Sequence, residues 1–232
     1  MTDTLQKRFR MPKMEGAMAR WYARQRGSAN QRETYRKQAA QLTRGLSDGA
    51  DVLEVAPGPG YLAIEIAQLG RFHVTGLDIS RTFVDIATQI AGQEKVQVDF
   101  RHGDVESMPF ESDTFDLIVC QAAFKNFGRP VVAINEMHRV LRPGGRAVIQ
   151  DLSRDASAAD IAEEVRRMQT GRVNGFVIRR TLAGLRLRAA TRDRLQGLAA
   201  ASAFGGGEIL VDTITMEVRL NKRVAAAPNG GS

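Results

Sequence analysis

Cysteine, histidine and long apolar runs are scarce in this sequence. Its one cysteine, Cys120, cannot form an internal disulfide, and with only three histidines beside it the chain cannot supply a cysteine-rich zinc site. No stretch reaches the roughly 18 consecutive apolar residues of a transmembrane helix, and no apolar segment typical of a signal peptide follows the basic start. We therefore expect a soluble, unexported protein in a reducing cytoplasmic setting, with no metal site.

Basic residues exceed acidic ones, but unevenly along the chain. The formal net charge of +7 divides into +7 for residues 1–50, −4 for 51–150 and +4 for 151–232. A basic surface attracts polyanions such as nucleic acids, yet here two basic flanks surround an acidic middle. We interpret the flanks first as solvated helical faces and second as a lid that attracts an anionic substrate, and we do not expect a nucleic-acid partner.

The middle of the chain alternates short runs of β-forming residues with apolar residues at helical spacing. Helices of about ten residues between strands indicate βαβ units and a parallel sheet covered on both faces. The sequence therefore predicts a doubly wound α/β core. The predicted strands cover 52–56, 72–78, 96–100, 115–120 and 146–152, and the predicted helices between them cover 61–70, 81–91 and 131–141.

With 232 residues the chain is long enough for one domain with its own core. We interpret residues 1–232 as a single domain, in which helical lid segments lie before the first strand and after the fifth. Its predicted parts are an N-terminal helical segment (1–48), the α/β core (49–152), a helical insertion (153–190), a last helix with a Thr191 cap and two closing strands that turn near Asp212 (191–223), and a disordered tail (224–232).

A glycine-containing loop at residues 54–60, Glu-Val-Ala-Pro-Gly-Pro-Gly, joins the first predicted strand to a helix. Glycines there let the backbone approach a ligand, and the helix presents free N–H groups and a positive dipole end. Asp78 lies 18 residues after Gly60, at the end of the second predicted strand. A carboxylate there can accept hydrogen bonds from both hydroxyls of a ribose. The two features together indicate an adenosine-containing cofactor.

The loop and Asp78 alone also satisfy the fingerprint of an NAD(P) site. Two further acids, Glu54 before the loop and Asp104 after the third predicted strand, favour a different adenosine cofactor. An acid that accepts the exocyclic amine of adenine explains Asp104, whereas a pyrophosphate site explains neither residue. Phe115-Asp116 at the fourth strand and Leu-Arg-Pro-Gly-Gly at 141–145 add to the pattern.

These motifs, in this order and spacing, resemble class I S-adenosylmethionine-dependent methyltransferases, in the small-molecule group that includes the ubiquinone and menaquinone C-methyltransferases. The resemblance covers residues 50–152. It implies a Rossmann-like sheet of seven strands with the last antiparallel, S-adenosylmethionine as cofactor and S-adenosylhomocysteine as product. By this resemblance the cofactor-binding residues are Glu54, Ala56, Pro57, Gly58 and Gly60 for the amino-acid part, Asp78 and Ile79 for the ribose, Gly103, Asp104 and Val105 for the adenine, and Gln121 for the methionine end or the substrate.

The loop departs from the family's acid-x-Gly-x-Gly-x-Gly pattern, because Ala56 replaces a glycine and Pro57 and Pro59 flank Gly58. Proline fixes φ, so we expect a stiff, ordered loop that retains cofactor binding.

Candidate acceptor-binding residues lie outside the core motifs. Their aromatic and cationic character suits a flat or anionic aromatic acceptor. They are Trp21, Tyr22, Phe124, Lys125 and Asn126, with Tyr35 and Phe127 in the same segments and Phe176 in the helical insertion 153–190. No residue stands out as a general base, and we interpret Asp116 and His138 as structural.

The sequence therefore predicts methyl transfer to an O, C or N nucleophile of a small organic molecule. One alternative is an RNA methyltransferase that uses the basic flanks, although the Asn/Asp-Pro-Pro-aromatic signature of nucleic-acid amino methyltransferases is missing after the fourth strand. An NAD(P)-binding oxidoreductase and a catalytically silent cofactor-binding protein are the others. The sequence leaves the oligomeric state open, with a homodimer as one alternative.

Overall fold

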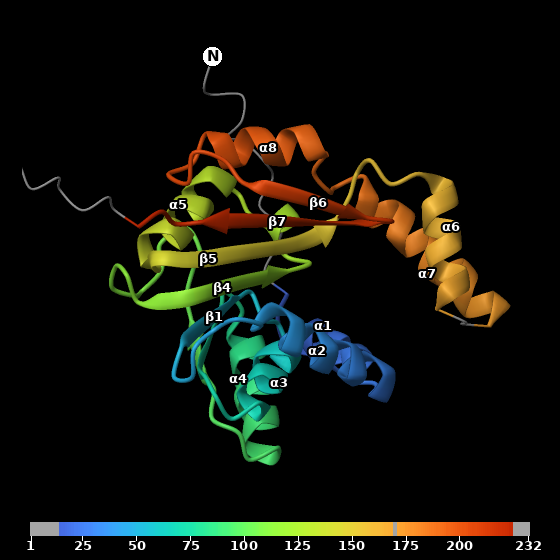
Figure 1. Cartoon of the computed structure of the whole chain (residues 1–232). Helices are drawn as coiled ribbons and strands as arrows, with labels where there is room; N and C mark the ends of the chain where they lie inside the picture. The colour runs from blue at the N-terminus through green and yellow to red at the C-terminus, as the bar shows by residue number, and fades with distance from the viewer. Residues whose placement is uncertain (1–13, 169–170, 225–232) are drawn as a thin grey trace, which may run out of the picture.

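A seven-stranded mixed sheet forms the centre of the protein (Figure 1). The computed structural model describes residues 14–168 and 171–224. The strands are β1 (Asp51–Val55), β2 (His73–Asp78), β3 (Asp99–His102), β4 (Phe115–Gln121), β5 (Leu141–Leu152), β6 (Glu208–Asp212) and β7 (Thr215–Asn221). They follow the order β3-β2-β1-β4-β5-β7-β6 across the sheet.

The pairing of the strands confirms the predicted fold class. β1 pairs in parallel with β2 and β4, and the parallel pairing continues to β3 on one side and β5 on the other. β7 runs antiparallel to both β5 and β6. The strand order reverses direction between β1 and β4, and in open α/β sheets a ligand site forms beyond the carboxyl ends of the strands at such a point.

Helices cover both faces of this sheet (Figure 1). They are α1 (Gly16–Arg26), α2 (Ala29–Leu42), α3 (Tyr61–Gln68), α4 (Arg81–Gln93), the short 3-10 helix η2 (Phe124–Asn126), α5 (Pro130–Val140), α6 (Ala158–Arg167), α7 (Arg172–Arg186) and α8 (Arg192–Ala200). α1 to α4 lie on one face and α5 and α8 on the other, while α6 and α7 project beyond the carboxyl end of β5. None of the described helices has the length and apolarity needed to cross a bilayer.

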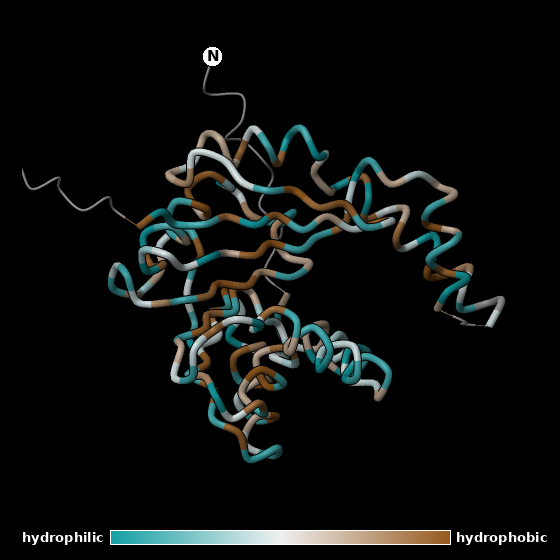
Figure 2. The backbone as a smooth tube through the Cα atoms, viewed as in Figure 1, coloured by the Kyte–Doolittle hydropathy of each residue, from teal (hydrophilic) through white to brown (hydrophobic). Residues whose placement is uncertain are grey.

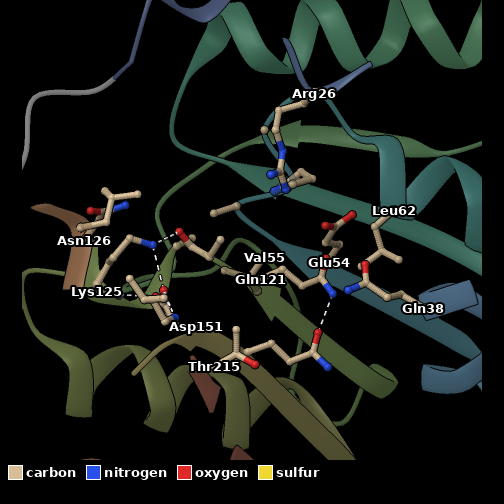
Figure 3. A pocket seen from close by; sticks show the side chains of 18 of the residues that line it. Arg26, Gln38, Glu54, Val55, Leu62, Gln121, Lys125, Asn126, Asp151 and Thr215 are labelled. Carbon is tan, nitrogen blue, oxygen red and sulfur yellow. Dashed lines mark hydrogen bonds and ion pairs between the residues drawn. The ribbon is translucent and has the colours of Figure 1, made fainter. Parts of the chain in front are cut away.

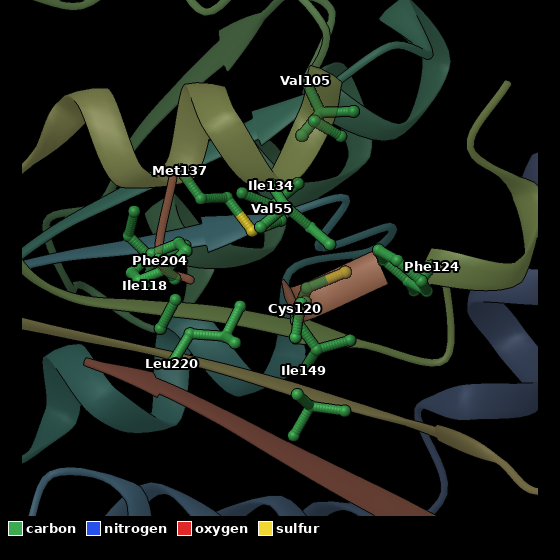
Figure 4. Packing of buried hydrophobic residues seen from close by; sticks show 14 of the residues in the cluster. Val55, Val105, Ile118, Cys120, Phe124, Ile134, Met137, Ile149, Phe204 and Leu220 are labelled. Carbon is green, nitrogen blue, oxygen red and sulfur yellow. The ribbon is translucent and has the colours of Figure 1, made fainter. Parts of the chain in front are cut away.

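The central strand β4 is apolar on both sides because both sides are buried. Leu117 and Val119 join the cluster under α2 and α3, whereas Ile118 and Cys120 point to the opposite cluster under α5 and α8 (Figure 4). Alternation across the strand produces this division. Burial of one such aliphatic side chain is worth about 1.5–3 kcal/mol, so the two clusters hold the helical layers to the sheet. In Figure 2 the hydrophobic colour accordingly follows the strands, and α2 is largely hydrophilic.

Short polar side chains define where several helices begin. Ser80 accepts a hydrogen bond from the Phe83 N–H at the start of α4, and Thr191 accepts one from Arg194 N–H at the start of α8. These are N-caps, which satisfy N–H groups that lack a partner within the helix. The predicted Thr191 cap is confirmed.

Two strands begin several residues away from their predicted starts, and the other strand boundaries differ by two residues at most. β3 begins at Asp99 rather than 96, because Asp99 is the first residue that pairs with β2. β5 begins at Leu141, not 146, since Leu141 pairs with Phe115 before a register shift. The Pro-Gly-Gly sequence lies between the predicted helix 131–141 and the predicted strand 146–152. It forms an irregularity inside β5, with Gly144 at φ +85°. Most of the predicted disordered tail, 225–232, lies outside the described residues.

A buried ion pair attaches α2 to α3 and α4. Arg32 Nη2 lies 2.8 Å from Glu65 Oε1 and 2.6 Å from Glu94 Oε2, and the Glu65 side chain is only 1% exposed. We expect Arg32→Ala to lower the free energy of unfolding by about 3 kcal/mol, because it removes the main partner of a buried charge. Urea unfolding measures this change.

Arg36→Ala provides the matched control, since Arg36 is 61% exposed and 3.5 Å from Glu65. An exposed pair contributes about 0–1 kcal/mol. Equal losses in the two variants would contradict the role given to Arg32.

Candidate cofactor and acceptor site

A cavity of about 1090 Å³ opens at the carboxyl ends of β1, β2, β4 and β5. α1 and α2 contribute to its wall from one flank, and α6 and α7 from the other. Figure 3 shows Lys125 and Asp151 pointing toward each other on one side, with Glu54 and Gln38 on the other. The site thus lies at the strand-order reversal, where β1 and β4 are neighbours.

The loop after β1 turns sharply into α3. Ala56, Gly58 and Gly60 have φ values of +54°, +56° and +78°. Ala56 therefore occupies the left-handed region that favours glycine, which costs a residue with a Cβ about 1–2 kcal/mol. Gly60 does not line the cavity. A Cβ on it would lie 2.6 Å from Phe100 Cζ and 2.8 Å from Ala87 Cβ, so this glycine permits close packing of α3 against the sheet and α4.

Asp78 holds the loop in place from the end of β2. One carboxylate oxygen accepts the Gly58 N–H at 2.9 Å, and the other accepts the Ser80 N–H at 2.8 Å. Burial raises the Asp78 pKa to about 6, against these hydrogen bonds, which lower it. Each carboxylate oxygen has a second lone pair. Asp78 lines the cavity and can therefore accept two further donors from a ligand.

Glu54 forms a buried acidic group beside the loop. Its side chain accepts a hydrogen bond from the Ala63 N–H at 2.8 Å, and the residue is 3% exposed. Burial raises the Glu54 pKa to about 8, with a further contribution from the negative charge of Asp78. A cationic ligand group would stabilise the ionised form. Perturbed acids in a cavity are typical of functional sites.

The segment after β3 forms the adjoining wall. Gly103, Asp104 and Val105 line the cavity together with Ile79. The Gly103 N–H donates to the backbone oxygen of Asp78 at 2.9 Å, and Asp104 Oδ1 accepts the Glu106 N–H at 3.0 Å. These contacts place the predicted ribose and adenine segments side by side.

A buried ion pair lies on the other side of the cavity. Lys125 Nζ is 2.8 Å from Asp151 Oδ1, and their side chains are 8% and 10% exposed. The Lys125 N–H donates to Asp151 Oδ2 at 3.0 Å, and the ammonium also donates to the Ala122 carbonyl. Sequence reasoning missed Asp151. Its signal is a polar residue at the end of an apolar strand, the same signal that identified Asp78.

A row of polar side chains crosses the sheet below the cavity. Gln121 Nε2 donates to Gln150 Oε1 at 2.5 Å, and Gln150 Nε2 donates to Glu217 Oε2 at 2.6 Å. These residues are register partners on β4, β5 and β7. All three line the cavity. Gln150 and Glu217 were not predicted, because the antiparallel pairing with β7 brings them together.

The remaining acceptor candidates divide by position. Tyr22 and Asn126 line the cavity, as do Tyr35 and Phe127. Trp21 is 56% exposed and Phe124 is buried in the core, and neither lines the cavity. Phe176 is also outside the lining, and it is 66% exposed. Arg26 was not predicted, yet it lines the cavity and lies over the Tyr35 ring at 5.5 Å.

The residues interpreted as structural lie away from the cavity lining. Asp116 Oδ2 accepts the Asp51 N–H at 2.8 Å and a hydrogen bond from Arg142 at 2.6 Å. It therefore fastens the amino ends of β1 and β4. His138 packs edge-on against Phe204 at 4.8 Å between ring centroids. These contacts agree with a structural role for both residues.

Residues 53–149 match a family model described as "Methyltransferase domain". This part of the chain is therefore similar to a methyltransferase domain. The matched region contains the loop, Asp78, the segment after β3 and Lys125. The helices α1, α2, α6 and α7, which complete the cavity, lie outside the matched region.

Two curated relatives match about half of this chain. A demethylmenaquinone methyltransferase of Deinococcus radiodurans is 36% identical over 107 residues, which are 46% of this chain and 44% of that protein. A ubiquinone biosynthesis O-methyltransferase of Xanthomonas oryzae is 33% identical over 115 residues, 49% of this chain and 48% of that protein. The chain thus spans about half the length of the curated relatives that it matches.

A solved structure shares the fold beyond the matched residues 53–149. The crystal structure of a putative S-adenosylmethionine-dependent methyltransferase from Methanococcus maripaludis superposes with a TM-score of 0.73 at 18% identity. The superposition covers 95% of this chain and 99% of the Methanococcus maripaludis chain. The likeness includes the flanking helices as well as the sheet.

Proposed function

We propose that the protein transfers the methyl group of S-adenosylmethionine to a small organic acceptor. The observation that carries the proposal is the pair of buried acids at the ends of β1 and β2. Glu54 and Asp78 face one cavity on either side of a loop that turns at Gly58. The matched methyltransferase domain supports the same function.

The residues of the site fit S-adenosylmethionine. Glu54 would hold its cationic amino-acid end, since a buried acid with one hydrogen bond is stabilised by a positive group. Asp78 would hold the ribose hydroxyls, and Asp104 with Val105 the adenine. A dinucleotide pyrophosphate gives no role to a buried acid at Glu54. When bound, the cofactor supplies a methyl group already activated by its sulfonium centre.

The opposite side of the cavity would bind the acceptor. An ammonium has three N–H groups, and among the described residues Asp151 and the Ala122 carbonyl accept two from Lys125. The third can donate to an acceptor oxygen and favour its deprotonated form. Gln121 provides an adjacent amide. These groups would orient the nucleophile, and correct positioning can supply much of the rate.

The acceptor class we propose is an aromatic molecule with an ionisable oxygen, such as a phenol or quinol. Tyr22, Tyr35 and Phe127 supply aromatic surface to the cavity, and the names of both relatives refer to quinones. The cytoplasmic setting stays a prediction. The names of these two relatives support neither an RNA methyltransferase nor an oxidoreductase.

Methyl transfer can be tested with S-adenosylmethionine labelled on its methyl group. The panel contains phenols, quinols, amines, aliphatic acids and RNA. We expect label to enter phenols or quinols. Turnover of RNA alone would contradict the small-molecule proposal, and turnover of aliphatic acids alone would contradict the aromatic acceptor.

Asp78→Ala should weaken S-adenosylhomocysteine binding by about 1–3 kcal/mol, because a buried, charged hydrogen-bond acceptor is lost. Isothermal titration calorimetry measures the affinity, with NADH as a second ligand. Asp85→Ala is the control, since Asp85 is an exposed acid on α4. Unchanged affinity in Asp78→Ala would mean that the ribose assignment is wrong, and binding of NADH without S-adenosylhomocysteine would refute the cofactor.

A further inference from the structure

Two helices that line the cavity also expose apolar side chains to solvent. α1 supplies Tyr22 and Arg26 to the cavity, while Met18 and Trp21 on the same helix are 63% and 56% exposed. α7 supplies Leu182 and Leu185 to the cavity. Both helices therefore have an inner face toward the site and an outer face that no described element covers.

The outer face of α7 combines apolar and cationic groups. Phe176 and Val177 are 66% and 57% exposed, and Arg179 and Arg180 follow them on the exposed side. No carboxylate of the described residues pairs with either arginine, in contrast to Arg167 on α6, which lies near two glutamates. The outer face of α1 is similar, because Arg20 and Arg24 flank its exposed Trp21.

We propose that the outer faces of α1 and α7 dock on an anionic phospholipid surface. Amphipathic helices with exposed aromatic and aliphatic residues among arginines bind at the lipid headgroup level, where the apolar groups enter the boundary and the cations meet lipid phosphates. Charge supports this occupant, since the segments that carry these helices are basic and the core between them is acidic. Nucleic acid would satisfy the arginines but leave Phe176 and Met18 without an apolar partner.

The position of the two helices strengthens the inference. α1 and α6–α7 lie at the same end of the molecule (Figure 1), beyond the carboxyl ends of the parallel strands. Exposed apolar residues at the opposite end are isolated: Leu69 follows α3 and Val224 follows β7. Docking through α1 and α7 would place the flanks of the cavity at the membrane surface.

Trp21 is the only tryptophan of the chain, so its fluorescence reports directly on α1. The full chain is mixed with vesicles of phosphatidylglycerol and phosphatidylcholine, and separately with vesicles of phosphatidylcholine alone. We expect cosedimentation and a blue shift of Trp21 emission with the anionic vesicles only, and both should weaken as salt is raised. Absence of binding, or binding without a shift, would overturn the proposal.

The double variant Phe176→Glu/Val177→Glu should weaken vesicle binding about tenfold or more, because it removes two apolar groups and adds two negative charges. Leu69→Glu/Val224→Glu is the matched control, with the same charge change at the opposite end, and should bind as the unmodified protein does. Both variants should keep the unfolding temperature and the S-adenosylhomocysteine affinity of the unmodified protein. Equal losses of vesicle binding in the two variants would overturn the assigned face. So would a dimer, seen by analytical ultracentrifugation, that the Phe176→Glu/Val177→Glu variant no longer forms. Tighter binding to RNA than to vesicles would also overturn the proposal.

Discussion

Replacing Glu54 by glutamine should weaken S-adenosylhomocysteine binding about 30- to 100-fold at pH 8. The charge-assisted hydrogen bond between a carboxylate and the ligand ammonium is worth about 2–3 kcal/mol. Glutamine keeps the shape of the side chain and can still accept the Ala63 N–H that Glu54 accepts at 2.8 Å. The loss of affinity would therefore measure the contribution of the Glu54 charge.

The same substitution should remove most of the pH dependence of binding. The Glu54 pKa is raised to about 8, so near pH 7 the free protein carries a protonated Glu54, which must lose its proton to pair with a cation. Affinity should rise with pH up to about 8, by up to roughly tenfold per pH unit. Calorimetry in two buffers of different ionisation enthalpy counts the released proton. A Glu54→Gln variant with an unchanged pH slope would show that another group titrates.

The stability of the ligand-free protein should follow the opposite trend. Because the folded-state pKa of Glu54 is raised from 4.5 to about 8, the folded state binds more protons than the unfolded state between these values. The stability that the protonated Glu54 contributes at pH 4 is therefore lost as the pH rises toward 8. In Glu54→Gln this part of the slope should be absent, which thermal unfolding across pH 5 to 8 can measure.

The second large effect concerns the buried pair on the acceptor side. Asp151→Ala should lower the free energy of unfolding by about 3–5 kcal/mol, because the ammonium of Lys125 stays buried without its counter-charge. The Asp151 side chain is 10% exposed and also accepts the Leu152 N–H at 2.8 Å. Chemical denaturation measures the loss, and methyl transfer should fall with it.

A double variant separates stability from function. Lys125→Met/Asp151→Leu removes both charges, and replacing a buried ion pair by apolar residues is often neutral or stabilising. We expect its stability to recover to within about 1 kcal/mol of the original protein, while methyl transfer to phenols stays reduced at least 100-fold. Turnover at the original rate in a stable double variant would show that Lys125 does not position the acceptor.

The cofactor side was predictable because its signals are local. A strand, a loop with glycines and a helix follow one another within residues 52–68, and Asp78 ends the next strand. The parallel sheet then brings all these carboxyl ends to one edge. Asp151 ends an apolar strand as Asp78 does, but its partner Lys125 comes from a distant segment of the chain. Glu217 carries no local pattern, because its partner Gln150 comes from another strand.

On the acceptor side, the sequence did not show which side chains of a helix face the cavity. Trp21 and Tyr22 are neighbours on α1, and successive helical residues point about 100° apart. Only Tyr22 lines the cavity. The polar composition of α1 did not indicate which face is inward, and the same holds for Phe124 and Lys125 in η2, where Phe124 enters the core.

The place of β7 in the sheet governs when the fold can be completed during synthesis. β7 is the last described strand along the chain, yet it lies between β5 and β6. Its apolar residues Met216, Val218 and Leu220 close the cluster under α5 and α8. Until residue 221 has left the ribosome, the nascent chain keeps an unpaired β5 edge beside an open apolar surface. Such edges promote association between chains, so we expect the nascent chain to be most prone to association before its final hairpin has emerged.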